Sequence, residues 1–263
     1  MYRVQTAFIT VLASLVVAAP AVSQTIATDR PDFVESSSTV GKGSVQMEGA
    51  VAFEKRSALV TEAETFTTPF LLRVGVADGW ELRIESDWFT RRTTRGEVGQ
   101  LTTNGLADFA LGAKWAFFAP ETGDAPSMAV LGHADLPTGS GDFRGDGMRP
   151  SIRITAEWSL PGDWGIGIMP GVLYDRTGDN RFISGIFGAV VGKGLTDSLR
   201  AFVELAFDQM AGRQYGGTSG YIDYGITFLL NPRWQLDAGF ALGITDQAPD
   251  SGFTFGLSGL LPR

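Results

Sequence analysis

Hydrophobic and polar positions alternate strictly along the stretch WELRIESDWF, residues 80–89. Glu81, Arg83, Glu85 and Asp87 occupy every second position, and most of the residues between them are tryptophan or aliphatic. Successive side chains on a β-strand point to opposite faces, whereas a helical period would scatter these four charges around a cylinder. The stretch therefore predicts a strand with one charged and one apolar face.

The same alternation recurs along the chain and predicts about twelve strands. They cover residues 44–54, 66–76, 80–90, 106–117, 128–136, 151–159, 164–174, 182–192, 199–208, 221–230, 234–243 and 253–260. Short connections (77–79, 160–163, 194–198 and 231–233) alternate with long polar ones (55–65, 91–105, 137–150, 175–181, 209–220 and 244–252). The segment 118–127 is an exception, since it is long on the side of the short turns. Short turns at one rim and long loops at the other are typical of an outer-membrane barrel with both termini in the periplasm.

The two faces of the predicted strands differ in charge. One face is almost uncharged, whereas the other carries charges of both signs among glycine and alanine residues. If the apolar face meets lipid, the charged face lines a lumen. The predicted lumen-lining residues are Arg73, Glu81, Arg83, Glu85, Asp87, Asp108, Lys114, Arg153, Glu157, Arg200, Glu204, Asp223 and Asp237.

Alternation alone does not exclude a soluble β-domain, in which the apolar face would turn inward. The tryptophans favour lipid, because all six fall on the apolar face at or near a predicted strand end, five of them on the side of the short turns. Such a ring is typical of a membrane interface, where an indole has one wet edge. The predicted aromatic girdle comprises Trp80, Trp88, Trp115, Trp158, Trp164 and Trp234. The predicted fold is all-β: a single antiparallel transmembrane β-barrel of about 12 strands, outer-membrane type, over residues 44–261.

The first residues predict export. Arg3 is followed by an apolar stretch over residues 7–18 and by the small-residue cleavage site Ala21-Val22-Ser23, which together are typical of a secretory signal peptide, residues 1–23. Its removal leaves a formal charge of −9, because only Arg3 of the 21 basic residues and none of the 29 acidic residues is lost. An acidic chain is a poor partner for nucleic acid. With no cysteine, it has no disulfide framework.

A family resemblance begins at TDRPDFVESSSTVGKGSVQMEGAVAF, residues 28–53, and continues at LADFALGAKW (106–115), LPTGSGD (136–142) and QLDAGFALG (235–243). In these motifs the chain resembles the bacterial family named for the meta-pathway of phenol degradation. The resemblance implies an outer-membrane barrel that passes small compounds, including aromatic or hydrophobic ones. The chain departs from many outer-membrane strands in ending on Leu-Leu-Pro-Arg rather than on an aromatic residue.

The polar segment 24–43 precedes the first strand and shows no alternation. It is either a periplasmic tail or a segment that folds back into the lumen as a plug, with Asp29, Arg30 and Asp32 pairing with the charges of the wall.

Catalytic and metal-binding motifs are weak. His133, the only histidine, falls with Asp135 on the predicted inner face, and nothing places a serine and a carboxylate beside it as an outer-membrane lipid hydrolase requires. The glycine-rich stretches 41–44 and 192–194 lack the spacing of a phosphate loop, and the loop 139–147 lacks a recognised calcium pattern. We therefore predict no enzyme, no cofactor and no metal.

The function expected from the sequence is passive passage of small molecules through the outer membrane of a Gram-negative bacterium. The mixed-charge wall would select solutes and loops such as 91–105 would restrict the mouth. The expected partners are outer-membrane lipid, small-molecule solutes and the barrel-assembly machinery. The alternative is a structural or surface-interaction barrel with a sealed lumen.

Overall fold

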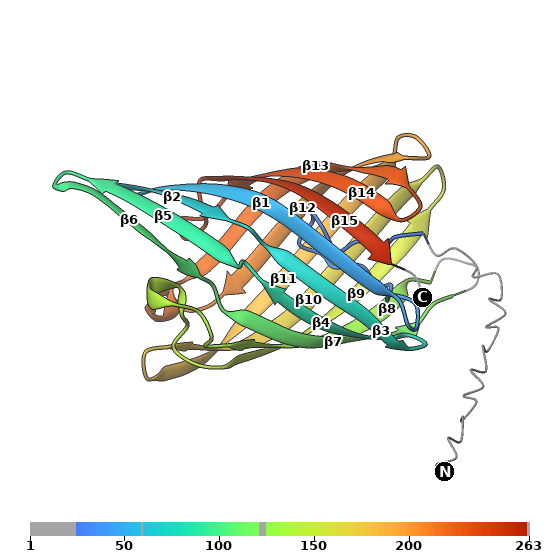
Figure 1. Ribbon diagram of the computed structural model, residues 1–263, viewed down its shortest axis with the longest axis horizontal. Helices are drawn as coiled ribbons and strands as arrows, with labels where there is room; N and C mark the ends of the chain where they lie inside the picture. Colours follow the sequence, from blue (N-terminus) through green and yellow to red (C-terminus); the bar gives the residue numbers. More distant parts are fainter. Residues whose placement is uncertain (1–24, 59, 121–124, 262–263) are drawn as a thin grey trace, which may run out of the picture.

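Antiparallel strands follow one another around a closed barrel in the computed structural model, which describes residues 25–58, 60–120 and 125–261 (Figure 1). The predicted signal peptide, residues 1–23, lies outside the described residues. The strands are β1 (Val45–Ala58), β2 (Thr61–Thr67), β3 (Phe70–Ala77), β4 (Trp80–Ser86), β5 (Phe89–Gly96), β6 (Gly99–Leu106), β7 (Phe109–Phe118), β8 (Ser127–Leu136), β9 (Arg149–Leu160), β10 (Trp164–Thr177), β11 (Asn180–Gly194), β12 (Leu199–Met210), β13 (Thr218–Asn231), β14 (Trp234–Gly243) and β15 (Ser251–Leu261). Two 3₁₀ turns, η1 (Gly141–Phe143) and η2 (Arg213–Tyr215), lie in the connections.

Three of the barrel strands are bent and are divided in two. β2 continues into β3, β4 into β5, and β6 into β7. β1 pairs with both β2 and β3, β5 pairs with β2, and β7 pairs with β4. β15 pairs with β1 from Val45 opposite Leu261 to Lys55 opposite Ser251, which closes the sheet. With each bent strand counted once, the described part of the chain forms a closed twelve-stranded antiparallel barrel, which confirms the predicted fold class.

β2, β5 and β6 extend beyond the barrel at the end opposite the C-terminus (Figure 1). The expectation that residues 55–65 and 91–105 are loops is therefore wrong: both are largely strand. So is the expected loop 175–181, which reduces to a tight turn between Thr177 and Asn180. The physical reason is that strands which leave the apolar zone can be polar on both faces, so they lose the alternation that identifies a strand in sequence.

The bend between β4 and β5 also reverses the order of faces. Glu85 and Thr90 both face the interior although they are five positions apart, and the residue between the two strands, Trp88, has a φ of 49°. The break between β6 and β7 has the same effect, because consecutive Ala107 and Asp108 both border the interior. Strict alternation therefore holds within β4 but not across the predicted strand 80–90.

The apolar face of the wall points outward. Leu82 and Ile84 are 52% and 38% exposed, whereas Glu81 and Arg83, which alternate with them, are 0% and 2% exposed. Trp80 stacks on Trp115 of the neighbouring strand, with ring centroids 5.2 Å apart. In the described residues, no helix is long and apolar enough to cross a membrane.

Candidate functional site: the occupied lumen

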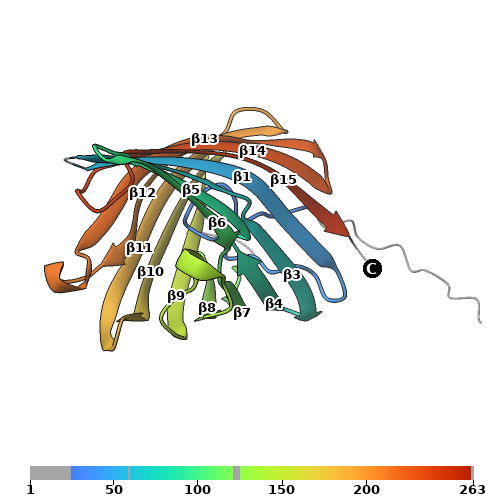
Figure 2. The same cartoon turned by 60° about the vertical axis from the view of Figure 1, so that its left-hand side comes forward.

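Residues 25–43, here called the lumen segment, run inside the barrel. The segment begins at the end of the short turns, where the Ile26 amide donates to the Pro232 carbonyl (2.8 Å). It returns to the same end, where the Gly43 amide donates to the Gly75 carbonyl (2.7 Å) before β1 begins. Figure 2 shows this loop enclosed by the strands. Because it contains no strand or helix, its backbone groups need partners from the wall.

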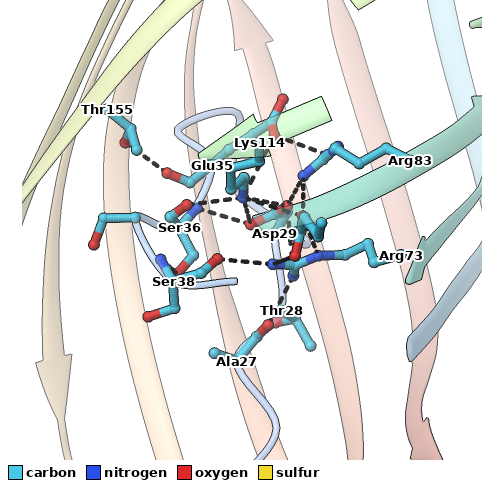
Figure 3. Close-up of polar contacts among 12 residues, drawn as sticks. Ala27, Thr28, Asp29, Glu35, Ser36, Ser38, Arg73, Arg83, Lys114 and Thr155 are labelled. Carbon is cyan, nitrogen blue, oxygen red and sulfur yellow. Dashed lines mark hydrogen bonds and ion pairs between the residues drawn. The ribbon is translucent and has the colours of Figure 1, made fainter. Parts of the chain in front are cut away.

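Asp29 lies at the centre of an ion-pair cluster with three cations of the wall (Figure 3). Its carboxylate is 2.5 Å from the Arg83 guanidinium, 2.9 Å from the Lys114 ammonium and 3.5 Å from the Arg73 guanidinium. These cations stand on β4, β7 and β3, which are adjacent strands. All four side chains are at most 3% exposed. Burial raises the pKa of Asp29, but Arg73, Lys114 and Arg83 outweigh it and hold the pKa far below its ordinary value.

Wall carboxylates accept hydrogen bonds from the backbone amides of the lumen segment. Glu204 accepts from Phe33 (2.6 Å) and Val34 (2.7 Å). The remaining contacts of this kind are Glu48 with the amide of Asp29 (3.0 Å), Glu157 with that of Ser37 (2.6 Å) and Glu81 with that of Val40 (2.8 Å). Charge-assisted bonds of this type are among the stronger ones in proteins, so they fix a segment that lacks regular structure.

An apolar contact adds to the polar ones. Val34 packs with Met169, Val190 and Phe202 of β10, β11 and β12, in a cluster that is at most 4% exposed. The wall makes room for it at Gly188, where an added Cβ would lie 2.6 Å from Val34 Cγ2. The inner wall is therefore not uniformly polar, and it matches the segment in shape as well as in charge.

The three residues singled out for a lumen plug lie in this segment. Arg30 pairs with Asp237 (3.3 Å) and donates to Thr254 (2.5 Å). Asp32 has a weaker contact, 3.9 Å from Arg200. Burial, and next the Glu204 carboxylate, raise the pKa of Asp32 to about 8.

The predicted wall residues divide into two groups. The first contacts the lumen segment through side-chain hydrogen bonds or ion pairs and comprises Arg73, Glu81, Arg83, Lys114, Arg153, Glu157, Arg200, Glu204 and Asp237. The second lies nearer the long loops and comprises Glu85, Asp87, Asp108 and Asp223. Of these, Asp108 holds the loop that contains η1, because its carboxylate accepts from the amides of Gly139 (2.7 Å) and Gly145 (2.9 Å).

The predicted lumen-lining and plug residues include neither Glu35 nor Glu48. Glu35 pairs with Arg83 and Arg153, each at 2.8 Å, and Glu48 pairs with Arg73 at 3.1 Å. Glu48 carries a usable signal, since it stands on the charged face of the first predicted strand. Glu35 carries none, because a segment without period gives no indication of which side chain meets which wall residue.

Beyond the lumen segment, towards the long loops, lies a cavity of about 1010 Å³, here called the vestibule. Asp29, Pro31 and Phe33 contribute to its floor, and residues of the wall and of the η1 loop form its sides. His133 lies near it, and its Nδ1 atom is 2.8 Å from Glu85 rather than from a serine. Among the described residues, no group of three or more His, Cys, Asp or Glu side chains is arranged to hold a metal ion.

Solved structures with a similar fold are outer-membrane proteins. The COG4313 outer membrane channel from Pseudomonas putida F1 superposes with a TM-score of 0.66 at 11% identity, over 88% of this chain and 98% of that one. The beta domain of the Bordetella autotransporter BrkA gives 0.53 at 12% identity, over 83% and 99%. The KdgM porin in complex with disordered oligogalacturonate gives 0.51 at 8% identity, over 82% and 98%. At such identities the likeness establishes the outer-membrane barrel fold alone.

A comparison with the curated proteins finds no match. A family model does match, over residues 28–260, a range that begins within the lumen segment and ends in the last strand. The match confirms the resemblance carried by the motifs at residues 28–53. The chain belongs to the family described as "Putative MetA-pathway of phenol degradation".

Proposed function

We propose that the protein is an outer-membrane channel for the passive passage of small molecules, and that the lumen segment closes it. In the orientation that we propose, the short turns and both ends of the chain face the periplasm. The β2–β5–β6 extension and the vestibule then face the exterior. The barrel-assembly machinery would insert it after the signal peptide is removed.

The observation that carries this proposal is the way the vestibule ends. A cavity of about 1010 Å³ stops at a segment that belongs to no strand. Side-chain contacts from the wall hold most of this segment, so it can leave the lumen without breaking the strand pairing of the barrel. A lumen filled by the wall's own side chains could not open in that way.

The family description supports small aromatic or hydrophobic compounds as the solutes. The vestibule offers apolar surface for them, because Phe33, Phe143, Phe202 and Tyr221 are among its lining residues. The mixed-charge wall below would then be exposed to the solute only when the lumen segment moves.

A second candidate is a structural or surface-interaction barrel whose lumen stays sealed. The density of the ion-pair cluster favours it, since Arg73 and Lys114 are fully buried and each contacts several partners of opposite charge. The two candidates differ in a single property, which is whether the lumen can conduct.

Planar-bilayer recording of the refolded protein separates them. Deleting residues 28–42 should raise single-channel conductance strongly over that of the full chain, and liposomes carrying the deletion variant should take up phenolic solutes faster. A variant in which residues 28–42 are replaced by glycine and serine at equal length is the matched control, because it keeps the tether but loses the contacts. A deletion variant that folds and passes no ions would establish the sealed barrel instead.

A further inference from the structure

The vestibule is strongly acidic. Among the residues that the structure describes, eleven carboxylate side chains and five guanidinium groups line it, and no lysine or histidine does. A cavity with low-dielectric walls and an excess of one charge concentrates ions of the opposite sign. The vestibule therefore favours cations over anions before any contact is made.

The carboxylates of the vestibule differ in their partners. On the side of β4 and β8 some of them are paired, as Glu85 with His133 (2.8 Å) and Asp135 with Arg149 (3.1 Å). Glu54, Asp208 and Asp223 form no ion pair within the described residues. Together with Asp32 of the floor, these three carboxylates are here called the acidic wall.

Strand register shows how open the acidic wall is. Glu204 is directly opposite Asp223, and the same row continues through Ala241 and Gly252 to Glu54 on β1. The two residues between Asp223 and Glu54 are small, so a recess separates the carboxylates. The row continues through Thr65 to Arg92, whose guanidinium is engaged with the Phe143 ring at 5.6 Å.

Several buried polar atoms of vestibule-lining residues have no hydrogen-bond partner within the described chain, and two of them are oxygens of Asp223 and Thr90. Asp223 is 8% exposed, and its Oδ1 atom has no hydrogen bond within the described chain. Thr90, on the opposite side of the cavity, is 4% exposed and its Oγ1 atom also has none. Buried polar atoms are normally satisfied, so an unpaired acceptor on a cavity wall indicates a ligand that donates a hydrogen bond.

Aromatic rings border the acidic wall. Tyr221 lies on β13 two residues before Asp223, and its ring meets that of Phe33 edge-on with centroids 6.2 Å apart. Phe202 lines the same side. Ring faces and carboxylates together are the surroundings that an organic ammonium group prefers. A bare metal ion is a poorer match, because no three carboxylates of the described chain converge closely enough to hold one.

We propose that the acidic wall is a binding site for the ammonium group of an arylalkyl amine, with Asp208 and Asp223 facing the cation and Tyr221 and Phe33 contacting its ring. The site deepens the proposed channel function, on which its role in solute entry rests. Asp32 fits this assignment, because burial and the neighbouring Glu204 carboxylate raise its pKa to about 8, and a bound cation would favour its ionised form.

The test is isothermal titration calorimetry of the refolded full chain in nonionic detergent, with three probes that share a ring: benzylammonium, benzyl alcohol and benzoate. Benzylammonium should bind about tenfold more tightly than benzyl alcohol, a difference of about 1.4 kcal/mol, and benzoate more weakly still. Asp223→Asn and Asp208→Asn should each remove most of the preference for benzylammonium while leaving the affinity for benzyl alcohol unchanged.

The matched control is Asp179→Asn, which removes one carboxylate from an exposed turn at the same end of the barrel. Equal affinities for the three probes, or an equal loss in Asp179→Asn, would overturn the proposal. Far-ultraviolet circular dichroism establishes that each variant is folded. Calorimetry measures binding without passage, so the site and the channel are tested separately. A protein that binds benzylammonium but never conducts would retain the site and refute the channel. A protein that conducts but shows no preference for benzylammonium would retain the channel and refute the site.

Discussion

At the scale of single residues, Asp29 has the most demanding environment in the lumen. Three cations share one carboxylate, and all four groups are almost completely removed from water. The attraction within such a buried cluster roughly offsets the cost of burying its members, but removing one partner leaves the others uncompensated. Loss of the negative charge of Asp29 alone should therefore strongly weaken the attachment of the lumen segment to the wall.

Asp29→Asn should lower the free energy of unfolding by about 3–5 kcal/mol, the usual cost of breaking a buried ion pair. The lumen segment should also leave the barrel, because Arg73, Arg83 and Lys114 would otherwise repel one another around a neutral amide. Urea unfolding in lipid vesicles gives the first quantity. Maleimide labelling of Ser37→Cys, in a chain with no other cysteine, gives the second. Asp197→Asn in a short turn is the control, and unchanged labelling in Asp29→Asn would contradict the prediction.

Asp32 should make closure sensitive to pH in the opposite direction to an ordinary ion-paired carboxylate. Its pKa is raised from 3.8 to about 8 inside the lumen, so the enclosed state binds the proton that the released state loses. The contribution of Asp32 to closure is thus complete below about pH 4 and is lost as the pH rises through about 8. Conductance should increase between about pH 4 and pH 8, and Asp32→Asn should remove this increase. A pH profile identical in wild type and variant would show that Asp32 is not responsible.

At the scale of elements, alternation predicted the strands that lie within lipid and missed those that leave it. β4 shows the pattern throughout, because lipid on one side and buried charges on the other impose opposite demands on neighbouring residues. β5 and β6 have water on both faces, so threonine and arginine occur on either side and the pattern is lost. The strand breaks near Trp88 and Asp108 reverse the faces, which no periodic template anticipates.

β11 provides a prediction about shape rather than charge. Gly188→Val should displace the lumen segment, because even the added Cβ would lie 2.6 Å from Val34 Cγ2. Labelling of Ser37→Cys and conductance should both rise. Gly132→Val on β8 is the matched control, since a Cβ there has no heavy atom within 4 Å and Gly132 is exposed on the outer face. If both variants behave like wild type, the segment tolerates the added volume and the close fit at Gly188 does not determine its position.

At the scale of the whole molecule, the sequence predicts the barrel wall better than it predicts the position of the lumen segment. The charges of the wall stand at strand positions, so register and face follow from period two. The lumen segment has no period, so its position depends on many tertiary contacts, such as Glu204 with two consecutive amides, that have no local signature. Of the residues that hold the lumen segment in place, those on the wall could thus be predicted from the sequence, whereas their partners within the segment could not.

The asymmetry of the barrel gives a final prediction. Both ends of the lumen segment lie at the short-turn end, where Ile26 bonds to Pro232 and Gly43 to Gly75, while the vestibule opens at the other end. A synthetic peptide of residues 25–43 should therefore block the deletion variant when added on the short-turn side, because only there can it retrace the native path to Arg73, Arg83 and Lys114. Peptide carrying Asp29→Asn should block at much higher concentration. In bilayers with the barrel inserted in one orientation, equal block from both sides would indicate nonspecific occlusion, and no block from either side would show that closure depends on the covalent link to β1.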